Sequence, residues 1–158
     1  MFGPCVTPFR VWPNDIDVFM HMNNGVYLTI MDLARTDLMI RSGVLKKVFK
    51  RRWYGVVAGE TIRFKRSLKP FQRYDITTEV VCWDHWSFYI VQTFSSDDTF
   101  MAKAVVDIRF LAKSGEKIPT SELTKMMEVQ QPSPPMPDWI ADWQRSQTAM
   151  SDIEHLEE

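Results

Sequence analysis

The chain has 158 residues, of which 45% are hydrophobic and 25% are charged, and its formal net charge is −1. These values are ordinary for one globular domain and predict a single packed core. The nearly neutral charge, without a helix-turn-helix, zinc-finger or RNP-like pattern, argues against a nucleic-acid partner.

The sequence shows neither a targeting signal nor a metal-ligand pattern. The opening MFGPCVTPFR has no basic segment and no long apolar run, and no later stretch approaches the roughly 18 uninterrupted apolar residues of a membrane span. We therefore expect a cytoplasmic protein without a membrane span. Cys5 and Cys82 are too few for a disulfide framework, and together with His21, His85 and His155 they lack metal-ligand spacing. We expect no metal and no cofactor.

The first predicted elements are a strand and a long helix. Residues 5–12, CVTPFRVW, are strand-like and are closed by a Pro-Asn pair. From Asn24 to about Ser42 apolar residues recur at helical spacing in two adjacent stripes. The stripes are Val26, Ile30, Leu33 and Ile40, and Tyr27, Met31, Ala34 and Leu38. Asn23 or Asn24 is suited to cap the start of this helix and Gly43 to end it. The breadth of the stripes predicts a mostly buried helix.

Downstream the apolar period changes to two, which is typical of strands. Strands are predicted near Tyr54–Ser67, Tyr74–Trp83, Phe88–Phe94 and Phe100–Ala112. The links between them are of hairpin length, so the sheet should be largely antiparallel.

The C-terminal part is predicted to be less regular. A helix is expected from Thr120 to Val129, with Ser121 as a possible cap. The stretch QQPSPPMP then breaks regular structure, DWIADWQR is expected to form a short amphipathic turn, and the last residues are expected to be disordered. The anchors of that turn would be Trp139, Ile140 and Trp143. We expect a main domain in residues 1–130, followed by a Pro-rich linker and tail in residues 131–158.

Basic residues dominate the middle of the chain. Between Arg41 and Arg73 there are eleven Lys or Arg residues against one acid, Glu60, whereas the segment after Ser114 is mostly acidic. Two interpretations stay open. The basic segment is either a solvated face that partly neutralises the acidic tail, or a docking surface for phosphate.

A dense polar motif precedes the long helix. The stretch DIDVFMHMNNGVYL resembles the D-x-D-x-x-G-H-V-N-N-x-x-Y-L signature of the 4-hydroxybenzoyl-CoA thioesterase branch of the hotdog superfamily. The matching residues are Asp15, Asp17, His21, Asn23, Asn24, Tyr27 and Leu28. Further on, DLARTDLMIRSGV resembles the E-x-A-R continuation of that family, with Asp32 at the glutamate position. Met20 stands where the family has glycine, which places a bulky side chain that could narrow the site.

The resemblance implies an α+β hotdog fold, in which a curved antiparallel sheet wraps around a long central helix. It also implies a homodimer or homotetramer, because hotdog domains generally pair so that each site is completed by its neighbour. The aromatic residues that could supply the buried area of that interface, or could equally be core, are Trp53, Tyr54, Phe88, Tyr89 and Phe94.

Thioester hydrolysis needs a base or nucleophile near the carbonyl carbon and donors aimed at the oxygen that becomes negative. Asp17 resembles the family's catalytic aspartate, and we assign His21 and Asn24 to catalysis with it. The N–H groups around Asn24 and Gly25, in the first turn of the helix, would polarise the carbonyl. Whether Asp17 acts as nucleophile or as general base stays open, with the second favoured.

The expected substrate-binding residues are Asn23, Gly25, Tyr27, Asp32, Arg63, Lys65, Arg66, His85 and Ser87. Several have a structural alternative. Asn23 and Asn24 are suited to capping, Tyr27 to the core, and Asp32 to a salt bridge with Arg35, which we favour. In the DHWSF turn, His85 and Trp86 replace a basic pair that relatives often carry near coenzyme A.

The function expected from the resemblance is hydrolysis of an acyl-CoA thioester to the free acid and coenzyme A. The alternative is a noncatalytic hotdog protein that binds acyl thioesters or acts as an interaction scaffold. A dehydratase of the same fold is less favoured, because the sequence lacks a second histidine and acid pair in suitable positions.

Overall fold

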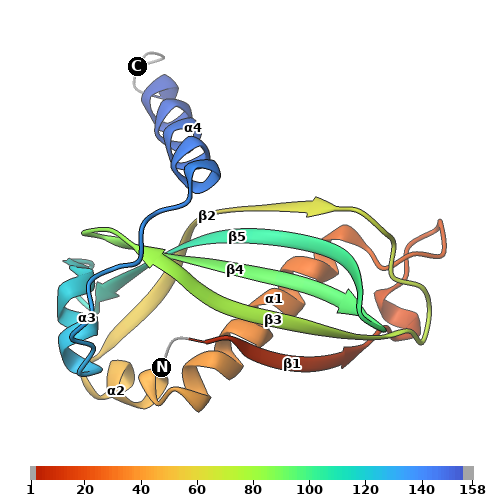
Figure 1. Ribbon diagram of the computed structural model, residues 1–158, viewed down its shortest axis with the longest axis horizontal. Coiled ribbons are helices and arrows are strands. Elements are labelled where there is room, and N and C mark those ends of the chain that lie inside the picture. The colour runs from red at the N-terminus through yellow and green to blue at the C-terminus, as the bar shows by residue number, and fades with distance from the viewer. Residues whose placement is uncertain (1–2, 155–158) are drawn as a thin grey trace.

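A computed structural model describes residues 3–154 of the chain. Within them, six strands form one antiparallel sheet in the order β1-β3-β4-β5-β2, with β6 paired to β5. The strands are β1 (Cys5–Arg10), β2 (Trp53–Phe64), β3 (Arg73–Trp83), β4 (Ser87–Ser96), β5 (Thr99–Ala112) and β6 (Lys117–Ile118). Figure 1 shows this sheet curving around the central helix, as the resemblance implied.

The helices are α1 (Asn24–Arg41), α2 (Val44–Lys50), α3 (Thr120–Met126) and α4 (Asp138–Glu154), with a 3-10 turn at Pro13–Asp15. None of the described helices is long and apolar enough to cross a membrane. The predicted antiparallel strands and the predicted α1 are confirmed, with bounds that differ by three residues or fewer. The short helix α2 was not predicted.

The ends of α1 follow from its flanking residues. The Asn23 side chain accepts the Gly25 N–H at 2.8 Å, so of the two candidate caps Asn23 is the one used. At the other end Gly43 adopts a φ of 76°, a left-handed conformation that glycine takes without steric cost. For α3 the expected cap is wrong, because Pro119 is the N-cap residue and Ser121 lies inside the helix.

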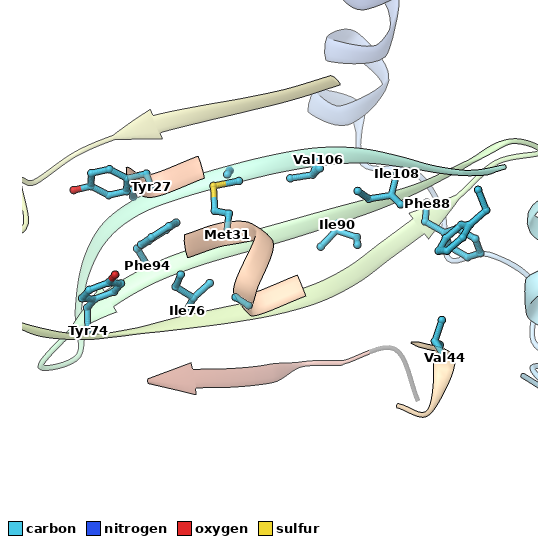
Figure 2. Close-up of a cluster of buried hydrophobic side chains, with 14 of the residues drawn as sticks. Tyr27, Met31, Val44, Tyr74, Ile76, Phe88, Ile90, Phe94, Val106 and Ile108 are labelled. Atoms are coloured by element: carbon cyan, nitrogen blue, oxygen red, sulfur yellow. The ribbon is translucent and has the colours of Figure 1, made fainter. Parts of the chain in front are cut away.

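The main core fills the space between α1 and the inner face of the sheet. Tyr27 and Met31 of α1 are at most 2% exposed and pack against strand residues. Figure 2 shows Tyr27, Phe94 and Tyr74 gathered at one end of this core, and Phe88 and Val44 at the other. The apolar stripe through Tyr27 and Met31 is therefore buried, whereas Leu33 and Ile40, from the other stripe, are 53% and 58% exposed. The prediction of a mostly buried helix holds for one stripe only.

A β-bulge changes which side chains of β2 face the core. The register with β5 shifts between Val57 and Gly59. Val57 is opposite Ile108 and Glu60 is opposite Val106, and both partners face the core. In a regular strand, residues three apart, such as Val57 and Glu60, face opposite sides of the sheet. The extra residue at Ala58 removes this difference, so both Val57 and Glu60 face inward.

The C-terminal segment differs from its prediction. Instead of a short turn, a helix of 17 residues, α4, packs on the outer face of the sheet. Ile140 is fully buried there against a small second core, and Trp143 packs beside it, so both are confirmed as anchors. Trp139 is 47% exposed and is not an anchor. Disorder was expected for the last residues, of which 155–158 lie outside the described part; the proposed domain boundary at residue 130 stays a prediction.

Candidate active site

The segment before α1 folds into a closed loop that holds Asp17. A bridge between Ile16 and Met22 closes its base, and the Asp17 N–H donates to the His21 carbonyl at 2.9 Å. Oδ1 of Asp17 accepts the N–H of Phe19 at 2.9 Å and that of His21 at 3.3 Å. Within the described part of the chain, Oδ2 accepts no hydrogen bond. One carboxylate oxygen is thus fixed by the backbone and the other is available to a ligand.

The first turn of α1 offers one unengaged donor to this loop. Asn23 donates its N–H to the Asp15 carbonyl at 2.7 Å, and its side chain accepts the Gly25 N–H. The Gly25 N–H, expected to polarise a carbonyl, is therefore engaged by the cap. The Asn24 N–H donates to no group among the described residues. It is the donor best placed to meet a developing oxyanion.

Met20 occupies the glycine position of the motif, and its backbone adopts a conformation that glycine favours. Its φ is 62°, in the left-handed region that costs most residues about 1–2 kcal/mol. Its side chain is 64% exposed, and those of Val18 and Phe19 are 90% and 75% exposed. Whether Met20 narrows the site therefore stays a prediction. The loop presents an apolar tip to solvent.

Tyr27 belongs to the core beside this loop. Its ring meets that of Phe64 edge-on, with centroids 4.8 Å apart. Burial raises the pKa of the Tyr27 hydroxyl, and a backbone hydrogen bond with Leu68 partly offsets that rise. The hydroxyl stays neutral at physiological pH, so Tyr27 can shape the site without supplying charge.

The predicted phosphate-binding residues lie at the same end of the molecule as the Asp17 loop (Figure 1). The Met22 N–H donates to the Leu68 carbonyl at 3.0 Å, which ties this loop to the segment after β2. Arg63, Lys65 and Arg66 are exposed there. Arg63 belongs to β2, whereas Lys65 and Arg66 follow its last residue, Phe64. The backbone N–H groups of Lys65 and Arg66 both donate to the Met101 carbonyl, so the three basic residues lie on one short segment at this end of the sheet.

A mostly apolar cavity of about 310 Å³ lies at the other half of α1. Its walls come from α1, α2 and β2, and its floor from β4 and β5. Typical lining residues are Leu38, Leu45, Phe49, Val57, Phe88 and Ile108. Asp32 and Arg35 give one end of the cavity its charge. This shape suits a group with an apolar body next to a polar end.

The charged end of the cavity is a hydrogen-bonded network around Arg35. Arg35 is 6% exposed and donates to Asp32, as the favoured salt bridge required, and to Oε1 of Gln92 at 2.8 Å. Gln92 donates in turn to the Met31 carbonyl at 3.0 Å. Glu60 Oε2 lies 3.8 Å from Arg35 Nη1 and accepts no hydrogen bond from the described residues. Burial raises the pKa of Glu60, Arg35 partly lowers it, and Asp32 raises it further.

His85 and Ser87 lie away from Asp17 within one protomer. The turn that contains His85 and leads into Ser87 follows the last residue of β3. The first residue of β3, Arg73, pairs with Arg10, which precedes the Asp17 loop, so β3 begins at the Asp17 end of the sheet. The 11 residues of β3 span roughly 35 Å, so the turn is at the opposite end of the sheet. Ser87 is buried on the outer face, where its hydroxyl accepts from Arg109 at 3.1 Å. Neither residue can meet the Asp17 carboxylate in the same protomer.

The sequence matches a known protein family and curated relatives. A family model described as thioesterase-like superfamily matches residues 11–144. The chain belongs to the thioesterase-like superfamily. Its match to Protein THEM6 of Xenopus laevis is 33% identical over 135 residues and covers 84% of this chain and 63% of that protein. The chain thus spans less than two thirds of the length of this curated relative.

Solved thioesterase-like structures share the fold. The probable thioesterase YbaW of Escherichia coli superposes with a TM-score of 0.73 at 21% identity, covering 78% of this chain and 96% of that one. The Staphylococcus aureus protein SAV2348, solved in complex with CoA, gives 0.69 at 15% identity over 85% and 90% of the two chains. The hotdog fold of this thioesterase-like chain is thereby confirmed.

The family motif located the Asp17 loop of this thioesterase-like chain, but it did not reveal the cavity. The cavity depends on α2, whose apolar residues Val44, Leu45, Val48 and Phe49 are spaced for one helical face. That spacing was the available signal. Glu60 could not have been found, because only the bulge at Ala58 turns it toward Arg35.

Proposed function

We propose that this chain hydrolyses an acyl-CoA thioester to the free acid and coenzyme A, with Asp17 as the catalytic carboxylate. The observation that carries the proposal is the pairing of an available carboxylate oxygen on Asp17 with an unengaged N–H on Asn24. A base and an oxyanion donor are the two groups that the reaction requires.

In the proposed mechanism Asp17 takes a proton from water while the water oxygen attacks the thioester carbonyl carbon. The Asn24 N–H and the positive end of α1 stabilise the oxyanion. The carbon–sulfur bond then breaks, and the coenzyme A thiolate takes up the proton held by Asp17. His21 positions Asp17, because the backbone N–H of His21 donates to Oδ1 of the Asp17 carboxylate.

Two observations support coenzyme A as the carrier. A structural neighbour has been solved in complex with CoA, and exposed basic residues near the Asp17 loop could pair with phosphates. Arg63, Lys65 and Arg66 would bind the 3′-phospho-ADP part. The predicted cytoplasmic location stays a prediction.

The separation of Asp17 from the cavity supports a homodimer, or a tetramer built from dimers, as part of the proposal. The 18 residues of α1 span about 27 Å, and the cavity lies along its second half. The first lining residue, Asp32, is about 12 Å along α1 from Asn24, and the buried side chains of Tyr27 and Met31 lie between the two within one protomer. A second copy running in the opposite direction would bring its cavity to the Asp17 loop. The roles of Asp32, His85 and Ser87 in substrate binding stay predictions under this arrangement.

A panel of acyl-CoA thioesters with graded aliphatic and aromatic acyl groups, assayed for thiol release, tests the function. We expect release that depends on the acyl group. Binding of acyl-CoA without any thiol release would instead favour the noncatalytic alternative, and neither binding nor release would reject both.

A further inference from the structure

The path of α4 across the outer face of the sheet can be followed from its contacts. Ile140 is fully buried against Tyr89 of β4 and Val105 of β5. Seven residues later, Oε1 of Gln147 lies 2.9 Å from the position that a Cβ would take on Gly59 of β2. Between these two points the helix crosses from the middle of the sheet to its edge strand.

The lengths agree with a nearly perpendicular crossing. Seven helical residues advance about 10.5 Å, and two strand spacings are about 9.6 Å. Three residues beyond Gln147, Met150 is about 4.5 Å further along the axis, which is about one strand spacing past β2. Figure 1 shows α4 projecting beyond β2. Met150 thus overlies the place where a further strand would lie.

Met150 continues the face of α4 that packs on the sheet. Ile140, Trp143, Gln147 and Met150 are three, four and three residues apart, which places them on one side of a helix. Ile140 is fully buried, whereas Met150 is 57% exposed, because no described strand lies beyond β2. The sheet-facing side of α4 therefore extends past the sheet and exposes an apolar side chain.

The edge that α4 overhangs is itself unpaired. β2 has 12 residues and pairs with β5 alone among the described strands, so its other edge presents free backbone donors and acceptors. A second copy can pair with this edge through a two-fold axis perpendicular to the sheet, which makes the two β2 strands antiparallel. The strand that would then lie beneath Met150 is β2 of the second copy.

We propose that α4 is a clasp between two protomers, which reaches over the β2 edge and packs Met150 on the outer face of β2 in a second copy of this chain. By symmetry each dimer contains two such clasps. The proposal extends the dimer of the proposed function, but its test measures association and requires no substrate.

Sedimentation equilibrium of the full chain and of Met150→Glu provides the test. We expect a dimer whose dissociation constant rises at least about tenfold in Met150→Glu, since a charge would replace apolar burial at two symmetric places. Ala149→Glu adds the same charge to an exposed residue half a turn around α4 from Ile140, on the side away from the sheet, and should leave the constant unchanged. A chain ending at Gln147 keeps the anchors Ile140, Trp143 and Gln147 and should weaken the dimer like Met150→Glu.

Hydrogen exchange of the full chain provides a second measurement. Dilution below the dissociation constant should increase exchange in β2 and in residues 148–154 together. A monomeric chain would overturn the proposal. So would a dimer whose dissociation constant is unchanged by both Met150→Glu and the truncation at Gln147. The proposal would also be overturned if dilution changed hydrogen exchange in β2 but not in residues 148–154, or changed it in neither of these segments. Loss of thiol release with the dimer intact would reject the enzymatic proposal and leave the clasp standing.

Discussion

Arg35 Nη1 donates a hydrogen bond to Gln92 Oε1 at 2.8 Å, joining α1 to β4 through the interior of the protein. Both residues are buried, and Gln92 has no exposed surface. A buried guanidinium is tolerated only when its donors are satisfied. Gln92 meets that requirement and, through its amide, also binds α1 at the Met31 carbonyl.

Replacement of Gln92 by Leu should therefore destabilise the fold. The variant removes the acceptor for Arg35 and the donor to Met31, and we expect a loss of about 1–3 kcal/mol, as for unsatisfied buried groups. Urea denaturation measures it. Thr93→Ala, at the next and half-buried position of β4, should cost less. Equal midpoints for the Leu variant and the unaltered chain would contradict the role assigned to Gln92.

Glu60 should make stability depend on pH in the opposite sense to an ordinary salt-bridged acid. Burial, the first cause, raises its pKa above the unfolded value of about 4.3, so the folded state holds the proton more tightly. The associated stability is full below the unfolded pKa and is lost as pH rises through the folded pKa. Thermal unfolding from pH 4 to 7 should show this decline, and Glu60→Gln should lack it.

Glu79→Gln is the matched control, because Glu79 is exposed on β3. The Glu79→Gln variant should still lose thermal stability between pH 4 and pH 7, as the unaltered chain does. Identical pH dependence in the Glu60 variant and the unaltered chain would show that the Glu60 carboxyl is solvated.

Local sequence signals predicted the parts of the fold that rest on periodicity. The α1 helix has an apolar stripe, an Asn cap and a Gly stop, and β3 to β5 alternate regularly, so each element could be located within three residues. The motif located Asp17 by resemblance. These features are encoded within a few residues of one another.

Features that depend on distant contacts were missed. The length of α4 depends on Ile140 reaching the outer core of the sheet, 35 or more residues away in sequence. The cavity exists only because α2 closes over β2. The inward turn of Glu60 depends on pairing between β2 and β5. Local sequence patterns do not predict contacts between residues that are far apart in the sequence.

Met20 offers a test of backbone conformation in the Asp17 loop. Because its φ is 62° and its side chain is exposed, Met20→Gly should relieve about 1–2 kcal/mol of strain, offset by about 0.5–1 kcal/mol of chain entropy. We expect a slightly higher melting temperature. Met20→Val should lower it, since a β-branched residue is least suited to this conformation. The reverse order of melting temperatures would exclude backbone strain at Met20.

The basic residues after the bulge should act on substrate affinity. A variant in which Arg63, Lys65 and Arg66 are changed to Gln should raise KM more than it lowers kcat, and the difference should shrink with added salt, which screens the attraction. Steady-state assays at two salt concentrations measure both effects.

The control changes Lys113, Lys117 and Lys125 to Gln. These residues are exposed on the β5–β6 turn, on β6 and on α3, respectively, and the variant has the same change in net charge. Its KM should stay near that of the unaltered chain. If both variants raise KM alike, general electrostatic attraction explains the effect and a dedicated phosphate site is excluded.

Asp17→Asn tests the proposed catalytic carboxylate. The Asn side chain keeps an oxygen that can accept from the Phe19 and His21 N–H groups, so the loop should stay folded. The variant lacks the charge needed to take a proton from water or to attack the thioester, and we expect hydrolysis to fall at least about a hundredfold while acyl-CoA binding is retained. Asp15→Asn and Asp32→Asn should have smaller effects, because Asp15 caps a turn at the Trp12 N–H and Asp32 pairs with Arg35. Comparable losses in all three, with lowered melting temperatures, would indicate a shared structural role, and full activity in Asp17→Asn would reject the assignment.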